Sequence, residues 1–174
     1  ICSPDSDRLL SNVTAGFDHE NMDIIDARVH KARSGLVMMI FVVLIESNTL
    51  INEDQLSAST LRIRKQLLDT RSKNQSKQKR LAPRMKHFPI ATEIKFHNNP
   101  DHRHTVMEVT AQDRPGLLHQ VANALVHCKA RLVNARVSTF GEKAEDVFLL
   151  HDRDGGEIRS KSQKDCLAAK IREA

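Results

Sequence analysis

The chain has 174 residues, of which 40% are hydrophobic and 28% are charged, and its formal net charge is +5. This length allows one or two small domains, and the longest apolar run, residues 36–45, is too short to span a bilayer. The basic excess is local, because residues 70–86 hold seven Lys or Arg and no acid, which leaves 20 basic and 22 acidic residues elsewhere. We therefore expect a cytoplasmic chain with no membrane partner, in which a basic connector joins mildly acidic folded units.

The three cysteines, Cys2, Cys128 and Cys166, are odd in number and lack the spacing of a metal site. This pattern predicts unpaired thiols in a reducing cytosol. The chain also begins with Ile1 rather than Met, and its first three residues are typical of the end of a strand. We expect it to be a fragment of a longer protein.

The first part of the chain predicts a small unit whose first strand lies almost entirely before Ile1. The elements predicted after that strand are, in order, a helix over about 9–19, a strand over 23–31, a strongly apolar strand over 36–45 and a helix over about 54–69. We assign residues 1–69 to a first domain and residues 70–89 to a basic interdomain linker.

Residues 90–174 are predicted to form a second domain, which repeats this order behind one additional edge strand. Its predicted elements are, in order, strands at 92–96 and 105–111, a turn at 113–116, a helix from about 117 to 128, strands at 132–140 and 147–150, and a last helix opened by a capping box of Ser162 and Asp165.

A sequence repeat relates the two domains. Residues 5–29 and 113–137 align without a gap at a constant offset of 108, with eight identical pairs among 25. Average residue usage predicts only about one or two identities by chance. A duplicated loop–helix–strand unit is more typical of binding and regulation than of catalysis.

The order strand–helix–strand–strand–helix is most of a ferredoxin-like βαββαβ unit. We therefore expect an α+β fold made of two such units, with an antiparallel sheet and helices on one face. A hairpin would place 92–96 antiparallel beside 105–111, at the edge where the absent last strand of such a unit belongs. The strand at 37–44 is apolar on both faces, which predicts that its second face meets a partner surface.

The stretch VMEVTAQDRPGLLHQVANAL, the strand with Asn134-Ala135-Arg136 and the GEKAEDVFLL hairpin together resemble the ACT domain. The first unit resembles it more loosely, through SPDSDRLL and NMDIIDARV. The tandem arrangement, with a basic linker followed by TEIKF, resembles the C-terminal region of the bifunctional enzymes that uridylylate and deuridylylate the PII signalling protein in bacterial nitrogen regulation.

This resemblance implies a regulatory role. In such enzymes a nucleotidyltransferase domain attaches UMP to PII, an HD-type hydrolase domain removes it, and a C-terminal ACT pair senses glutamine. Both catalytic domains, and the Mg²⁺ expected for the parent enzyme, would lie outside these 174 residues. Within the chain we expect no catalytic residue, no metal site and no cofactor.

The loop that precedes the helix of the second unit is the candidate ligand site. The N–H groups and the positive dipole end of a helix N-terminus suit a carboxylate. Gly116 allows a close backbone approach and Pro115 stiffens the entry, while Asp113 offers an acceptor for an amine and Asn134 suits an amide. The predicted ligand is glutamine or a similar small amino acid, and its predicted contacts are Asp113, Arg114, Pro115, Gly116, Leu117, Leu118 and Asn134.

Each of these features also has a structural explanation. Asp113 would cap the helix, Gly116 would permit the turn, and Asn134 would occupy a solvated strand position. The first unit has Asp5-Ser6-Asp7-Arg8 where the second has D-R-P-G, so the second loop is the one expected to bind. At the level of function, the alternatives are a structural or dimerising ACT module without a small ligand, and an ACT-containing regulator of another kind.

Two further signals are set aside. His151-Asp152 is an HD dipeptide, but it ends a predicted strand and lacks the additional ligands of a metal-dependent hydrolase. The basic linker lacks interleaved aromatic residues, so we expect no nucleic-acid partner. Whether the ACT units pair within one chain or between two is left open by the sequence.

Overall fold

A computed structural model describes residues 1–174 apart from 33, 46–51, 69–89, 99–102 and 174. Along the chain the elements are β1 (Cys2–Pro4), α1 (Leu9–His19), β2 (Met22–Lys31), β3 (Leu36–Ile45), α2 (Glu53–Leu68), β4 (Glu93–Asn98), β5 (Thr105–Gln112), α3 (Leu117–His127), β6 (Arg131–Phe140), β7 (Lys143–His151) and α4 (Lys161–Arg172). Each predicted element is present, and β7 begins four residues earlier than expected. The predicted linker lies outside the described residues, and the domain boundaries stay predictions.

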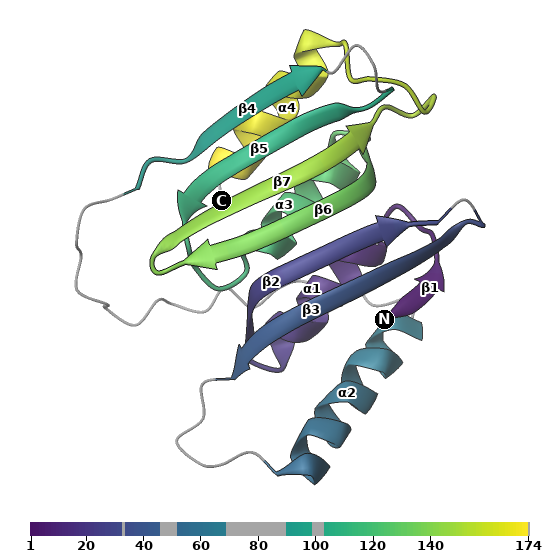
Figure 1. The fold of residues 1–174 in the computed structure, drawn as a ribbon, viewed down its shortest axis with the longest axis vertical. Helices are drawn as coiled ribbons and strands as arrows, with labels where there is room; N and C mark the ends of the chain where they lie inside the picture. Colours follow the sequence, from purple (N-terminus) through teal and green to yellow (C-terminus); the bar gives the residue numbers. More distant parts are fainter. Residues whose placement is uncertain (33, 46–51, 69–89, 99–102, 174) are drawn as a thin grey trace.

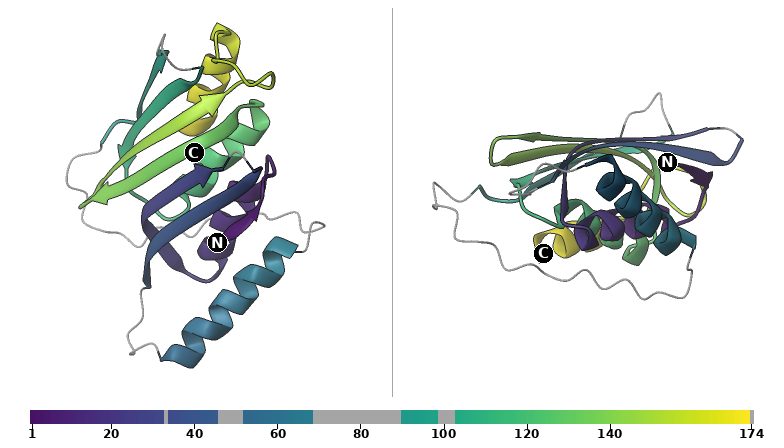
Figure 2. Two further views of the ribbon diagram at one scale, coloured as in Figure 1. Left: turned by 45° about the vertical axis from the view of Figure 1, so that its right-hand side comes forward. Right: turned by 90° about the horizontal axis from the view of Figure 1, so that it is seen from below.

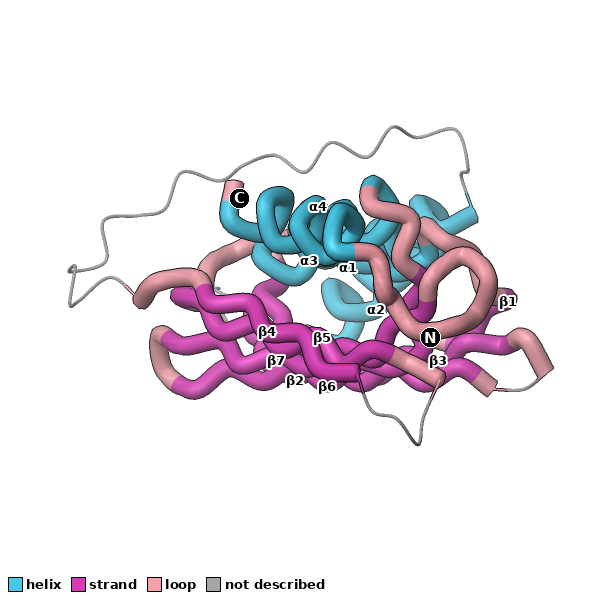
Figure 3. The backbone as a smooth tube through the Cα atoms, turned by 90° about the horizontal axis from the view of Figure 1, so that it is seen from above, coloured by secondary structure: helices cyan, strands magenta, loops and turns pink. Residues whose placement is uncertain are grey.

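The seven strands form one antiparallel sheet in the order β1-β3-β2-β6-β7-β5-β4. The strands of the first unit lie at one end of this sheet and those of the second unit at the other (Figure 1). All four helices pack on one side of the sheet (Figure 3), and the view from below in Figure 2 shows the same two layers. This arrangement confirms the predicted α+β class of two ferredoxin-like units of the ACT type.

The two units join where β2 pairs with β6. At the centre of this seam Arg28 lies opposite Arg136, and the two residues are equivalent in the repeat. Ala27 and Val29 lie opposite Val137 and Ala135 in the same register. A local two-fold axis therefore passes between the two arginines. The three identical pairs of the repeat that lie on these strands are the residues that build the seam, and the units pair within one chain.

The helix side of the sheet holds a single large apolar cluster that draws on both units. On the helices, His19 and His127 are exposed, but the other three identical pairs of the repeat are buried in both copies. They are Leu9, Leu10, Val13, Leu117, Leu118 and Val121. Identity along the helices therefore marks packing against the sheet, which burial of apolar side chains stabilises.

The two ends of the sheet are completed differently. β4 pairs with β5 along its whole length, with Ile94 opposite Val109, which confirms the predicted hairpin. β1 pairs with β3 through three residues, Cys2 to Pro4. On the open face, β3 exposes a row of apolar side chains, as the two-sided apolar pattern predicted. They are Leu36, Met38, Ile40, Val42 and Leu44. The partner surface expected there stays a prediction.

Helices α1 and α3 contact each other through a polar cluster under the seam. His119 Nδ1 lies 3.0 Å from the Ser11 carbonyl oxygen and 3.2 Å from Thr14 Oγ1, and Asn123 Nδ2 lies 2.9 Å from His119 Nε2. These contacts fit a neutral imidazole that donates from Nδ1 and accepts at Nε2. Ser11 and His119 are again equivalent in the repeat, so the cluster lies on the same local two-fold axis as the seam.

The prediction that all three cysteines are unpaired thiols is wrong. Cys128, at the end of α3, and Cys166, in α4, form a disulfide, and Cys2 is free and exposed. The two bonded residues are 38 positions apart in the chain, but α3 and α4 lie side by side in the helix layer (Figure 1). Sequence spacing alone does not show this proximity.

The predicted capping box at Ser162 and Asp165 is also wrong. α4 begins at Lys161, and its cap is Ser160, whose Oγ accepts a hydrogen bond from the Gln163 N–H. Serine at 160 and serine at 162 are both good caps, so sequence alone does not separate them. The Gln163 side chain instead donates to the Cys128 carbonyl oxygen at 3.0 Å, which ties the start of α4 to the end of α3.

Candidate functional site

The segment 113–118, here called the second loop, joins β5 to α3 and is fixed at both ends. The Asp113 N–H donates to the Glu142 carbonyl oxygen in the β6–β7 hairpin at 2.8 Å, and the Leu117 N–H donates to the Arg114 carbonyl oxygen at 3.2 Å. Gly116 is the N-cap of α3 and has a φ of 82°, in the left-handed region that favours glycine. The predicted role of Gly116 in the turn therefore has a direct structural cause.

No side chain caps the N-terminus of α3. The first N–H groups of a helix have no partner within the helix, and they form the positive end of its dipole. Because Gly116 carries no side chain, a carboxylate can approach these N–H groups closely. The binding of a ligand carboxylate at the second loop stays a prediction.

Arg114 lies beside this helix start and is half-buried. Its Nη2 donates to Gln120 Oε1 at 2.9 Å, while its Nε is buried without a hydrogen-bond partner among the described residues. Burial lowers the pKa of this guanidinium from its usual value. An arginine held in this way has unused hydrogen-bonding capacity next to the predicted ligand loop.

Asp146 is a buried carboxyl group that sequence analysis missed. It lies on β7, is 2% exposed, and accepts a 3.4 Å hydrogen bond at Oδ1 from the Ser138 N–H on β6. Burial raises the pKa of Asp146 to about 7, and the negative charge of Asp113 acts in the same direction. The signal was present in the alternation of β7, where Ala144, Asp146 and Phe148 share the buried face.

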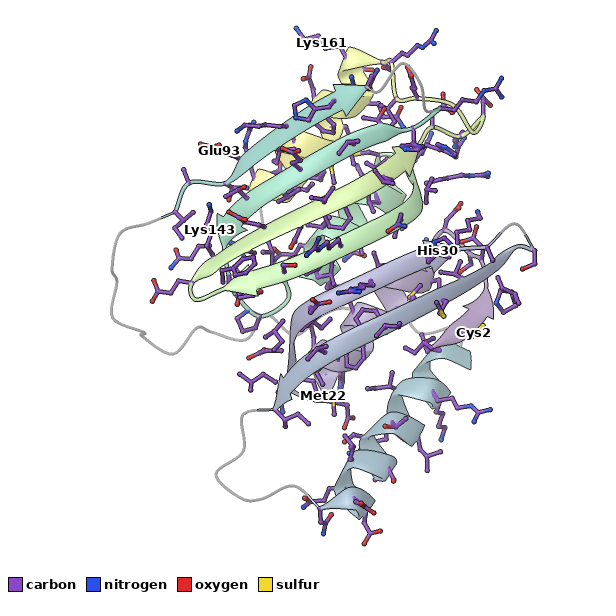
Figure 4. All side chains as sticks on the ribbon, viewed as in Figure 1. Cys2, Met22, His30, Glu93, Lys143 and Lys161 are labelled. Carbon is purple, nitrogen blue, oxygen red and sulfur yellow. A yellow bond between two sulfur atoms is a disulfide. The ribbon has the colours of Figure 1, made fainter. Side chains whose placement is uncertain are left out.

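The structure does not bring Asn134 beside the second loop. Asn134 pairs with Leu149 on β7 and with His30 on β2, while the second loop contacts the hairpin at the opposite end of β6. Six residues of strand separate Asn134 from Phe140, which corresponds to roughly 20 Å. Figure 4 shows His30 toward one end of β2, and Met22 and Lys143 toward the other end of the sheet.

The segment 5–8, here called the first loop, has the same place in the first unit but different chemistry. The Asp5 N–H donates to the Gly35 carbonyl oxygen at 3.0 Å, just as Asp113 bonds to its own hairpin. Lys31 Nζ binds the Asp5 carboxylate, and Arg131 Nε lies 3.9 Å from Asp7 Oδ1. The acidic groups of the first loop are therefore engaged by side chains of β2 and β6.

The HD dipeptide, which was set aside in the sequence analysis, has a structural explanation. The Asp152 carboxylate accepts the N–H groups of Asp154 and Gly156 at 2.9 and 2.8 Å, so it closes a turn after β7. Within the described residues, no group of three His, Cys, Asp or Glu side chains is placed to hold one metal ion. None of the described helices is both long enough and apolar enough to cross a membrane.

The fold and the second loop together define a class of protein. Two ferredoxin-like units of the ACT type share one sheet, and in the second unit a left-handed glycine stands at the helix N-cap.

Comparison with known proteins gives the particular relatives. The chain is 32% identical over 163 residues to the bifunctional uridylyltransferase/uridylyl-removing enzyme of Vibrio campbellii. This alignment covers 94% of the chain and 18% of that enzyme. It is 34% identical to the enzyme of the same name from Methylococcus capsulatus, over 85% of this chain and 17% of that protein. For the Xanthomonas oryzae pv. oryzae enzyme the identity is 34%, over 97% of this chain and 20% of that protein.

These similarities confirm the resemblance drawn from the sequence to one region of these enzymes. The chain spans about a fifth of the length of the curated relatives it matches. No protein-family model matches the chain, and no solved structure matches it significantly.

Proposed function

We propose that this chain is the amino-acid-sensing region of a bifunctional uridylyltransferase/uridylyl-removing enzyme, and that its ligand is glutamine. The observation that carries this proposal is the second loop, where the left-handed Gly116 leaves the N-terminus of α3 without a side-chain cap. Such a helix start binds the carboxylate of a small molecule. The similarity to enzymes of that name over nearly the whole chain supports the proposed context.

The proposed mechanism is a population shift between arrangements of the two units. A ligand shifts such an equilibrium only as far as its affinities for the two arrangements differ. The second loop is covalently continuous with α3, whose His119 contacts Ser11 of α1. Ligand at this loop thus has a short physical route to the first unit, through helix contacts and the β2–β6 seam.

The activity of the parent protein is part of the proposal. Its substrate would be the PII signalling protein, its compartment the cytoplasm, and its reactions the attachment and removal of UMP. Mg²⁺, which the resemblance implies for the parent enzyme, would be bound by its catalytic domains. No step of that chemistry is assigned to the residues of this chain.

A second candidate function is a structural ACT module that binds no small molecule. The continuous seven-stranded sheet and the buried contact between α1 and α3 favour it, since both hold the two units together without a ligand. The two candidates differ in one measurable property, which is stabilisation by an amino acid.

The test is thermal unfolding of the chain with glutamine, glutamate and a panel of other amino acids. A ligand present at 100 times its dissociation constant should add about 2.7 kcal/mol to the free energy of unfolding. We expect this stabilisation with glutamine, and its loss in Gly116→Leu. Stabilisation by no amino acid would favour the structural module, and unchanged binding in Gly116→Leu would remove the second loop from the site.

A further inference from the structure

The two units carry different residues at one buried position, which lies on β3 in the first unit and on β7 in the second. Arg28 lies opposite Ile40 in the first unit, and its repeat equivalent Arg136 lies opposite Val147 in the second. Met39 directly precedes Ile40 on β3, and Asp146 directly precedes Val147 on β7. Met39 and Asp146 are therefore structural equivalents, and each is 2% exposed. The fold accepts an apolar side chain at this place, so the carboxyl group of Asp146 is not required by the architecture.

Packing does not explain the carboxyl group either. Among the described residues, no Lys, Arg or His forms an ion pair with Asp146. Its hydrogen bond from Ser138 is long, at 3.4 Å. A carboxylate buried without a positive partner lowers stability, and positions that break a packing rule in this way are typical of functional sites.

The surroundings of Asp146 connect it to the second loop. Ala144, two residues along β7, forms a small buried cluster with Ala111 and Leu117, separate from the main apolar core. Leu117 is the first residue of α3, and two residues of strand span roughly 7 Å. The N-terminus of α3 and the buried Asp146 therefore lie on the same side of the sheet, connected by the packing of Leu117 against Ala144.

We propose that Asp146 is the residue that receives the ammonium group of an α-amino acid whose carboxylate lies at the N-terminus of α3. This inference rests on the proposed function and narrows its ligand class to zwitterions with a free amino group. N-Acetylglutamine has no ammonium group, so it is not expected to bind at this site. The first unit, with Met39 in place of the acid and engaged acids in its loop, offers no such pair of charges.

The proposal implies that binding releases a proton. The charged group acting on Asp146 is Asp113 in the second loop, while β5 presents Val109 and Ala111 to that side of the sheet, and β6 contributes the Ser138 N–H. With a pKa of about 7, Asp146 is close to half protonated at neutral pH before ligand binds. An ammonium group beside it favours the carboxylate, so the proton passes from Asp146 to solvent.

The experiment is titration calorimetry of the full 174-residue chain with glutamine near pH 7, in two buffers of different ionisation enthalpy. We expect release of about half a proton per glutamine bound, because that fraction of Asp146 is protonated beforehand. Asp146→Asn should weaken binding by about tenfold or more and remove the proton release. The matched control is Glu145→Gln, which removes the neighbouring exposed carboxylate and should change neither quantity.

The outcomes separate this inference from the proposed function. Glutamine binding that persists within about twofold in Asp146→Asn, with the same proton release, would overturn the role of Asp146 and leave the sensing function intact. Equal affinity for N-acetylglutamine would overturn it in the same way. Wild-type chain that binds no amino acid would overturn both. If Asp146→Asn does not fold, Asp146→Met, which copies the first unit, provides the second variant, and the wild-type comparison with N-acetylglutamine needs no variant.

Discussion

The two units of the chain agree where they build the fold and differ where a ligand would bind. Most of their identical residues are buried helix positions or lie at the β2–β6 seam, as with Arg28 and Arg136. Their loops differ, since the second has Gly116 at a helix N-cap and the first has Arg8 at the equivalent position. Neither helix start has a side-chain cap, so the copies differ in the left-handed glycine and the buried acid, which are present only in the second unit.

This comparison shows why an unequal pair can act as a sensor. The seam and the contact between α1 and α3 connect the first unit to the second. If only the second loop binds ligand, as proposed, a change at that loop reaches the first unit through these contacts. The predictions below each compare a change at a position that differs between the units with a change at a matched control position.

The largest expected effect concerns two phenylalanines. Phe148 lies opposite Ala135, and Phe41 lies opposite Ala27, which makes them equivalent. Phe148 is fully buried, whereas Phe41 is half-buried. Phe148→Ala should lower the free energy of unfolding by about 3–5 kcal/mol, and Phe41→Ala by about half as much. The measurement is urea denaturation of both variants. Equal losses of unfolding free energy would contradict the unequal burial of the two side chains.

The next effect is the pH dependence caused by Asp146. Its pKa is about 7 in the folded chain and 3.8 unfolded, so the folded state holds a proton that the unfolded state loses between these values. Stability from this group is full below about pH 4 and falls by up to about 4 kcal/mol as pH rises to about 7. Asp146→Asn should remove that fall, and the Glu145→Gln control should keep it. Parallel pH profiles for wild type and Asp146→Asn would contradict the assignment.

A smaller pH effect of opposite sign is expected from His119, which stands where the first unit has Ser11. Burial lowers the pKa of His119 from its model-compound value. Below about pH 6.5 the unfolded chain therefore binds a proton that the folded chain does not, and stability from this group is lost as pH falls. His119→Gln should reduce this loss, while the exposed His127→Gln should leave it unchanged. The comparison is made by denaturation at several pH values.

The smallest effect on stability is expected at two glycines with similar backbones. Gly116 has a φ of 82° and Gly35, in the β2–β3 hairpin, has a φ of 80°. A β-carbon at Gly35 would meet nothing within 4 Å. Each change to alanine should cost about 1 kcal/mol from backbone strain. Glutamine binding, followed by calorimetry, should weaken in Gly116→Ala and persist in Gly35→Ala. Equal effects on binding would mean that the second loop has no special role.

Much of the fold could be predicted from sequence, because local patterns fix it. Alternation gave the strands, helical spacing at Leu117, Leu118 and Val121 gave α3, and the repeat gave two copies of one unit. The pairing of β2 with β6 could not be predicted, since similarity between the two units does not reveal which strand edges pair with each other. The Cys128–Cys166 bond was missed for a similar reason, because it depends on the packing of two helices.

The candidate site was predictable in part. The D-R-P-G motif placed Gly116 at a helix start, which the structure bears out as a left-handed N-cap. Asn134 came from the polar face of the next strand, and in the structure it lies with Arg136 on the open face, away from the second loop. Asp146 was missed because it lies before the strand predicted at 147–150, whereas β7 begins at Lys143 and its alternation turns Glu145 outward and Asp146 inward.

The central claim is that the pair is unequal and that only the second unit binds an amino acid. Its most direct test is the stoichiometry of glutamine binding to the wild-type chain, measured by titration calorimetry at a known protein concentration. The account predicts one glutamine per chain, with binding weakened by Gly116→Ala. Two equivalent sites per chain, or one site unaffected by that change, would contradict it.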